Sequence, residues 1–182
     1  MDCRRAASGL DASEAWYHAA AAHARLPLRP NTGGVVADQS HMRVSTPPKL
    51  IAWSERYSVG ISRIDEQHQR LIDLINDLHA AMLVKREESE LAKILDGLAA
   101  YAVSHFATEE TLMKKFGYTG YERHKAEHDR LMAQVRLLLE KSRNNKAELT
   151  HEVMIFLQRW LVGHIVNVDK RYTAHLNAAG VS

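Results

Sequence analysis

The sequence repeatedly places histidine, and once glutamate, on the apolar face of a predicted helix. Four segments carry apolar residues at intervals of three or four, the period of a helix face that packs against a core. In each segment, side chains that bind metals continue that face. The six positions are His68, His105, Glu109, His124, His128 and His164. Imidazole and carboxylate groups that converge inside a bundle are typical ligands of a transition metal.

The second segment shows the pattern most clearly. Leu98, Ala102 and Leu112 share one helix face, and His105 and Glu109 fall on that face at the same spacing. A lone inward histidine is more often a satisfied core residue than a ligand, and histidine pairs four residues apart also occur on surfaces. Six inward polar groups are a stronger signal, because burying each one without a partner is costly. We therefore predict a buried metal site.

The six groups also share one level along the predicted bundle. They lie early in the first and third segments and late in the second and fourth, so alternating helix directions bring them to the same end. Five imidazoles and one carboxylate exceed the four ligands of a structural zinc ion, which favours two metals. This ligand chemistry suits iron, and it leaves manganese, zinc and cobalt open.

Four amphipathic helices must position these ligands. The apolar periodicity predicts helices over 65–84, with Asp65 as the N-cap, and over 89–116, 121–143 and 147–175. Short connections between long helices are typical of an all-α, up-down-up-down antiparallel four-helix bundle. We expect Leu50–Ile64 to pack across this bundle.

The first 48 residues differ from the rest of the chain. They hold all four prolines, and residues 1–50 carry six basic and four acidic side chains, which accounts for the whole formal charge of +2. We expect residues 1–48 to be a poorly ordered N-terminal extension and 49–182 to form the helical domain. An alternative is that Met42 is the true start and the preceding residues are a gene-model artefact.

Composition excludes several other classes of protein. A net charge of +2 argues against a nucleic-acid binder. The longest apolar run, Leu98–Val103, has six residues, far fewer than the roughly 20 that span a bilayer, so we expect no membrane insertion. No secretory signal is recognisable, and we expect a cytoplasmic protein. Cys3 is the only cysteine, so no intrachain disulfide can form.

Four motifs in the helical part resemble the hemerythrin family, specifically single-domain bacteriohemerythrins. They are Asp65-Glu66-Gln67-His68, His105-Phe106-Ala107-Thr108-Glu109-Glu110, His124-x-x-x-His128 and His164-Ile165-x-x-x-Asp169-Lys170. The resemblance extends over about residues 50–176. It implies a four-helix bundle with a non-haem di-iron centre.

The resemblance also implies a role for each ligand. His124, His128 and His164 would hold one iron, and His68 and His105 the other. Glu109 and Asp169 would bridge both ions (Fe2+/Fe3+) together with one oxo or hydroxo oxygen. This arrangement fills eleven of twelve octahedral positions and leaves one open, on the iron with two histidines, where O2 would bind. The wall of the O2 pocket would be formed by Leu71, Phe106, Trp160 and Ile165.

Asp169 poses a geometric problem. It lies five residues after His164, which is about 140° around an ideal α-helix. For both residues to reach the metals, the helix must bend, widen into a π-type turn or rely on side-chain reach. Gly163 would ease such a distortion, and close helix packing explains this glycine equally well.

The remaining histidines match none of the motifs. We assign His79, His151 and His175 to boundary or surface positions, and we infer no chemistry for those in the extension, His18, His23 and His41.

The leading functional hypothesis is reversible O2 binding for transport, storage or buffering, by a binding protein rather than an enzyme. An O2-consuming enzyme or a membrane oxidase is then a candidate partner. The alternatives are a di-iron oxidase or peroxidase, a nitric oxide-handling enzyme, and an oxygen- or iron-sensing module. The ligand set favours the first hypothesis, because few carboxylates donate to the metals and no extra inward acid or base is present for proton delivery. Sequence alone leaves the oligomeric state undetermined.

Overall fold

The computed structural model describes residues 48–143 and 151–182. The expected N-terminal extension and the Met42 alternative therefore lie outside the described residues, as does the predicted start of the fourth helix at Ala147. The described residues form the helical part of the chain.

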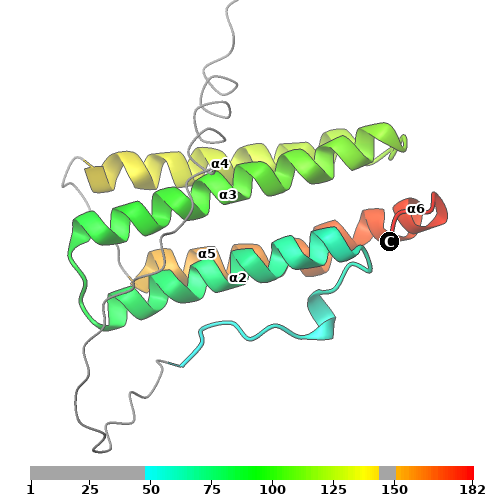
Figure 1. Cartoon of the computed structure of the whole chain (residues 1–182). Coiled ribbons are helices and arrows are strands. Elements are labelled where there is room, and N and C mark those ends of the chain that lie inside the picture. Colours follow the sequence, from blue (N-terminus) through cyan, green and yellow to red (C-terminus); the bar gives the residue numbers. More distant parts are fainter. Residues whose placement is uncertain (1–47, 144–150) are drawn as a thin grey trace, which may run out of the picture.

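Four long helices lie in two layers of antiparallel pairs (Figure 1). One layer holds α2 (Ser62–Leu83) and α5 (His151–His164), and the other holds α3 (Glu88–Lys115) and α4 (Tyr121–Arg143). The described residues contain no strand, so the predicted all-α, four-helix fold is confirmed. None of these helices is both long and apolar enough to cross a membrane.

The fourth arm of the bundle is interrupted by a change of helix type. After α5 the chain passes through a π-helical turn, η2 (Ile165–Asp169), and continues as α6 (Lys170–Ala178). The C-terminus lies at the same end of the bundle as the loop that joins α3 to α4 (Figure 1). We refer to this end of the bundle as the α6 end.

The segment before α2 is tied to two helices. The backbone of Ile51 and the side-chain amide of Asn76 exchange two hydrogen bonds, of 3.0 and 2.9 Å, and the amide of Gln158 donates to the carbonyl of Leu50. A single 3-10 turn, η1 (Glu55–Tyr57), buries the Tyr57 ring against the core. The segment thus packs along α2 and α5.

Asp65 does not cap α2, and that prediction is wrong. The helix begins at Ser62, with Ile61 at the N-cap position, so Asp65 already belongs to the helix. Its carboxylate accepts hydrogen bonds from the Ser58 hydroxyl at 2.6 Å and from the Val59 amide at 2.7 Å. Asp65 therefore fixes the preceding segment to the helix, because its carboxylate faces back along the chain.

The apolar faces of the helices meet in a core, and some of its side chains are fully buried. Leu95 is 0% exposed and belongs to the main apolar cluster, whereas Leu137 of α4 is 56% exposed. Leu95→Ala is expected to lower the free energy of unfolding by about 2–5 kcal/mol, because it removes buried apolar surface and leaves a cavity. Leu137→Ala is the matched control and should change it by less than about 0.5 kcal/mol in urea unfolding. Equal effects of the two substitutions would contradict the packing described.

Candidate metal centre

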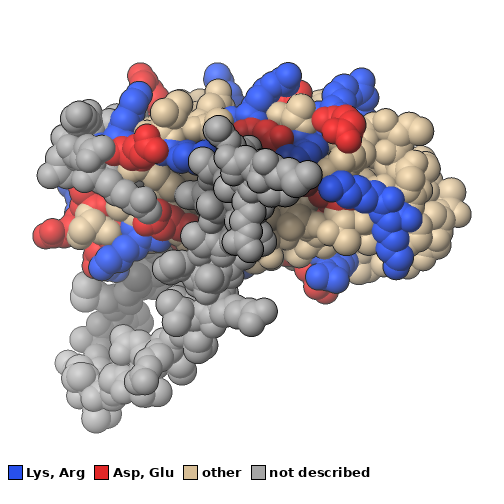
Figure 2. All heavy atoms as spheres, turned by 90° about the horizontal axis from the view of Figure 1, so that it is seen from above, with Lys and Arg blue, Asp and Glu red and all other residues tan. Residues whose placement is uncertain are grey.

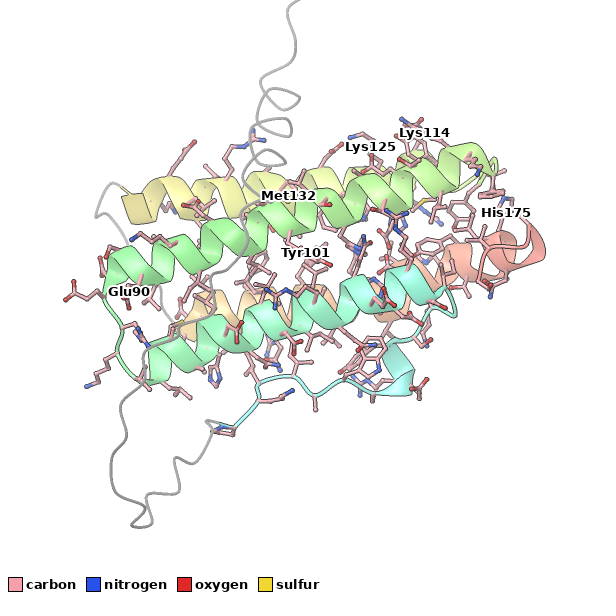
Figure 3. All side chains as sticks on the ribbon, viewed as in Figure 1. Glu90, Tyr101, Lys114, Lys125, Met132 and His175 are labelled. Atoms are coloured by element: carbon pink, nitrogen blue, oxygen red, sulfur yellow. The ribbon has the colours of Figure 1, made fainter. Side chains whose placement is uncertain are left out.

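Seven buried polar side chains lie close together toward the α6 end of the bundle. In Figure 3 the labelled His175 marks that end and Glu90 marks the opposite one. Each of the four long helices contributes at least one of the seven, and η2 contributes one more. The seven are His68 of α2, His105 and Glu109 of α3, His124 and His128 of α4, His164 of α5 and Asp169 of η2, and none is more than 5% exposed. The structure thus brings together all the metal ligands expected from the sequence.

Three imidazoles form the first group of potential ligand atoms. The Nε2 atom of His128 lies 3.0 Å from that of His124 and 3.1 Å from that of His164. Two nitrogens bound about 2.1 Å from one ion at right angles would lie about 3.0 Å apart. The spacing therefore fits ligands of a single octahedral metal.

Two further imidazoles form a second group, and each carboxylate lies between the groups. Oε1 of Glu109 faces His68 at 3.8 Å and His105 at 3.6 Å. Its other oxygen, Oε2, faces the first group, at 3.4 Å from His124 and 3.1 Å from His128. This carboxylate therefore presents one oxygen to each group, as a bridge between two ions requires.

Asp169 repeats this arrangement. Its Oδ2 lies 3.3 Å from Nε2 of His68, and its Oδ1 lies 3.0 Å from Nε2 of His164 and 3.5 Å from that of His124. Both Asp169 oxygens and both ring nitrogens of His68 are buried without a hydrogen bond. Such atoms are costly to bury unless a cation satisfies them. The donor set therefore fits a pair of metal ions.

The π-turn explains how Asp169 reaches this centre. Of the three possibilities that the sequence left open, the structure shows local widening, since η2 spans the five residues that end at Asp169. Hydrogen bonds from residue i to i+5 place a residue nearly above its fifth neighbour, so Asp169 returns to the face of His164.

Gly163 is not explained by close packing. A Cβ atom built at this position meets no heavy atom within 4 Å. The Gly163 carbonyl instead accepts a hydrogen bond from the Asn167 side chain at 3.0 Å. Asn167, within the widened turn, thus supplies a donor to a carbonyl at the end of α5.

Two polar side chains orient the ligand rings from outside the centre. Oε1 of Gln67 lies 3.1 Å from Nδ1 of His105, and Oε1 of Glu110 lies 3.0 Å from Nδ1 of His128. Hydrogen bonds to the distal nitrogen fix the orientation of a metal-binding imidazole and increase its basicity. Neither Gln67 nor Glu110 had a role predicted from the sequence, although each is adjacent in sequence to an expected ligand.

Tyr172 is a third contributor, and its role was not predicted from the sequence. Its ring is 0% exposed, and its hydroxyl donates a hydrogen bond of 2.6 Å to Oε1 of Glu109. Burial and the charges of Glu109 and Asp169 raise the pKa of Tyr172 well above its ordinary value, so the hydroxyl keeps its proton. Its position three residues after Asp169, on the same helix face, was the available signal.

Tyr172→Phe is expected to weaken metal binding by roughly 10- to 100-fold, the usual effect of removing a hydrogen bond to a metal ligand. The ring remains, so packing is largely preserved. Competition with a chelator under argon measures the affinity. Tyr121→Phe is the control, since the Tyr121 ring lies against Lys114 on the outside of the same end. Equal metal affinities of both variants and the unaltered protein would show that Tyr172 does not contribute to metal binding.

Burial and neighbouring carboxylates shift the pKa values of two of the histidines in opposite directions. Burial lowers the pKa of His105 to about 4. Burial also acts to lower the pKa of His128, but hydrogen bonds with Glu109 and Glu110 outweigh it and raise that pKa to about 9. Burial acts to raise the pKa of Glu109, but His105 and the hydrogen bonds from His124 and His128 hold it well below its ordinary value.

Metal uptake should therefore depend on pH. His128 is protonated below a pKa of about 9, and a metal must displace that proton. The affinity for Fe(II) is expected to rise with pH, by up to about tenfold per unit, and to level off above about pH 9. Anaerobic titrations in weak buffer measure both affinity and proton release. An affinity that is constant from pH 6 to 9 would contradict this expectation.

The four residues expected in the O2 pocket lie in or beside the apolar core around the ligands. The Phe106 ring stacks on His128 with centroids 3.8 Å apart, and Trp160 stacks on His164 at 4.5 Å. Leu71 and Ile165 are 3% and 1% exposed. Two of the four therefore contact the three-histidine group directly.

The other described histidines do not join the centre. His79 is half-buried, and His151 and His175 are exposed. Nε2 of His175 lies 2.8 Å from the Phe116 carbonyl, which anchors the last helix at the α6 end.

Comparison with known proteins gives consistent matches over the helical part. Residues 59–176 match the Hemerythrin HHE cation binding domain family. The chain is 38% identical to the bacteriohemerythrin of Methylococcus capsulatus (strain Bath) over 130 residues, which cover 71% of this chain and 98% of the relative. It is 33% identical to the bacteriohemerythrin of Stenotrophomonas maltophilia, over 70% of this chain and 85% of the relative.

A solved structure shows the same fold. A crystal structure of wild-type hemerythrin superposes with a TM-score of 0.67 at 38% identity, over 70% of this chain and 98% of that one.

Proposed function

The chain belongs to the hemerythrin family, and we propose that it binds O2 reversibly at a non-haem di-iron centre. This function would serve O2 transport, storage or buffering. The observation that carries the proposal is the position of Glu109 and Asp169, each with one oxygen directed at each group of histidines. Such a pair of carboxylates suits two ions held side by side.

The ligand roles follow from the two groups. His124, His128 and His164 would hold one iron, and His68 and His105 the other. Glu109 and Asp169 would bridge them. The group with two histidines has one protein ligand fewer, so this is the side on which O2 would bind. A bound iron pair supplies the reversible electron donation that O2 capture requires.

The residues of this chain control that chemistry in three ways. Gln67 and Glu110 orient His105 and His128 through their distal nitrogens. Tyr172 holds the Glu109 carboxylate by its hydroxyl proton. Leu71, Phe106, Trp160 and Ile165 contribute apolar surface, which disfavours entry of water and anions and so slows irreversible oxidation.

The composition of the buried site favours binding over catalysis. Among the described residues, the buried histidines and carboxylates all belong to the two groups, and Tyr172 bonds to one of them. No further buried acid or base is thus placed for proton delivery in the described part. Only two carboxylates, Glu109 and Asp169, would donate to the metals, which should also favour reversible binding over oxidising chemistry.

Cycling the iron-loaded protein between gases tests this proposal. The protein is loaded with Fe(II) under argon, exposed to O2 and returned to argon, while the visible absorption is followed. The proposal predicts charge-transfer bands that appear and disappear over repeated cycles. Rapid irreversible loss of these bands, with turnover of an added reductant, would instead support the di-iron oxidase alternative.

A further inference from the structure

A cavity lies on the outer side of one ligand ring, between the start of α4 and the start of α6. Its volume is about 210 Å³, several times the roughly 30 Å³ that a water molecule occupies in the liquid. Its walls are formed by Tyr118, Gly120, Arg123, His124, Glu127, Val168 and Arg171. The cavity can therefore hold a small polyatomic ligand next to the metal centre.

The charge around this cavity favours an anion. The exposed side chains of Arg123 and Arg171 both line it, and neither forms an ion pair within the described part of the chain. The acidic residue in the wall, Glu127, already pairs with Arg130 at 2.6 Å. The first turn of α4 adds the positive end of a helix dipole.

The surface at this end agrees with that charge. Figure 2 shows acidic and basic side chains interspersed over most of the face seen from above. Toward the α6 end, basic side chains extend over a largely uncharged surface. Of the acidic side chains near this site, Glu127 pairs with Arg130, and Glu122 lies in the first turn of α4.

His124 connects the cavity to the metal centre. Its Nε2 faces Glu109 and Asp169 at 3.4 and 3.5 Å, so its Nδ1 is directed away from these carboxylates, on a ring that is only 3% exposed. The His124 ring lines the cavity, and its Nδ1 has no hydrogen bond to another described residue. With a metal on Nε2, the Nδ1 atom must carry a proton to donate.

His124 differs in this respect from two other ligands, but not from His68, whose Nδ1 also has no hydrogen bond. His105 and His128 have Gln67 and Glu110 as partners for their Nδ1 atoms. Ligating histidines almost always have such a partner. At His124 the cavity takes the place of a protein acceptor.

We propose that this cavity is a binding site for a small divalent oxyanion of the phosphate or sulfate class. The anion accepts hydrogen bonds from Arg123, Arg171 and Nδ1 of His124. Guanidinium groups suit this ligand because their planar N–H groups bind two oxygens at once. Two guanidinium groups in the wall also disfavour a cation as the occupant.

The anion also regulates the centre, and this part of the proposal rests on the proposed function. A hydrogen bond from Nδ1 of His124 to an anion increases electron donation by the ring to the metal. Stronger donation stabilises the oxidised metal, so anion binding lowers the reduction potential of the iron pair. The cavity thereby links the redox behaviour of the centre to the concentration of an anion outside the O2 pocket.

Calorimetric titration with sodium sulfate tests the site on the full-length, metal-free protein at constant ionic strength. One saturable site is expected. Arg171→Gln and Arg123→Gln should each weaken it by about 10- to 100-fold, the usual effect of losing a charge-assisted hydrogen bond. Arg63→Gln removes the same charge from the exposed start of α2 and should leave the affinity within about twofold.

Either of two results overturns the binding site: no saturable sulfate binding, or equal binding by the Arg171→Gln and Arg63→Gln variants. The regulatory part is tested separately in the iron-loaded protein, where sulfate should lower the reduction potential unless Arg171 is replaced. An unchanged potential refutes that part alone. Sulfate binding without reversible O2 uptake would refute the proposed function and leave the site intact.

Discussion

Replacing His68 or His105 by alanine is expected to abolish the reversible visible absorption that O2 produces in the iron-loaded protein. These two rings are the protein imidazoles on the side of the centre with fewer ligands. Losing either leaves that ion with one imidazole and its share of two carboxylates, which weakens its binding severely. Iron analysis should therefore show fewer than two ions per chain, and the charge-transfer bands should be absent.

His79→Ala is the matched control for these substitutions. His79 lies on the same helix as His68, is half-buried and belongs to neither group of ligands. It should retain two ions per chain and full reversibility. Circular dichroism would show whether the alanine variants still fold. A folded His105→Ala variant with unaltered reversible O2 binding would refute the ligand assignment.

Removal of iron is expected to lower the thermal midpoint of unfolding by about 10 °C or more. A ligand at 1,000 times its dissociation constant stabilises the native state by about 4 kcal/mol, and two ions act here. The physical cause lies in buried groups such as Asp169 and His68, whose polar atoms have no hydrogen bond without a cation. Scanning calorimetry of the iron-loaded and chelator-treated protein measures the difference.

The His105→Ala variant provides the control for that difference. If binding of two iron ions causes the stabilisation, added iron should raise the thermal midpoint of this variant by much less than that of the unaltered protein. The same midpoint with and without iron in the unaltered protein would contradict a metal bound at the buried groups.

The fold could be predicted because apolar periodicity is local in sequence, and short connections between the resulting helices favour an antiparallel bundle. The apolar stripe that contains Leu95 and Leu98 predicted the bounds of α3 to within one residue at either end. Inward polar residues on such stripes identified six of the seven clustered side chains. Asp169 was added only through family resemblance, because an ideal helix would rotate it away from His164. Sequence periodicity could not choose the π-turn, since bending or side-chain reach would satisfy the same spacing.

Other features depend on tertiary contacts that a helical repeat does not encode. Asp65 has the chemistry of an N-cap, but in the structure Ser58 and Val59 donate to it from the preceding segment. Tyr172 occupies an apolar-type position, and only the three-dimensional arrangement shows its hydroxyl at Glu109, 63 residues away in sequence. Gln67 and Glu110 likewise orient His105 and His128 through contacts between different helices.

We propose that the buried groups hold an iron pair that binds one O2 molecule reversibly. The most direct measurement is the amount of O2 that argon recovers from the oxygenated protein, relative to the iron bound. We predict one O2 recovered for every two iron ions and for each protein chain, repeatedly and without loss. Consumption of O2 with little recovered, or one O2 for each iron ion, would contradict the claim.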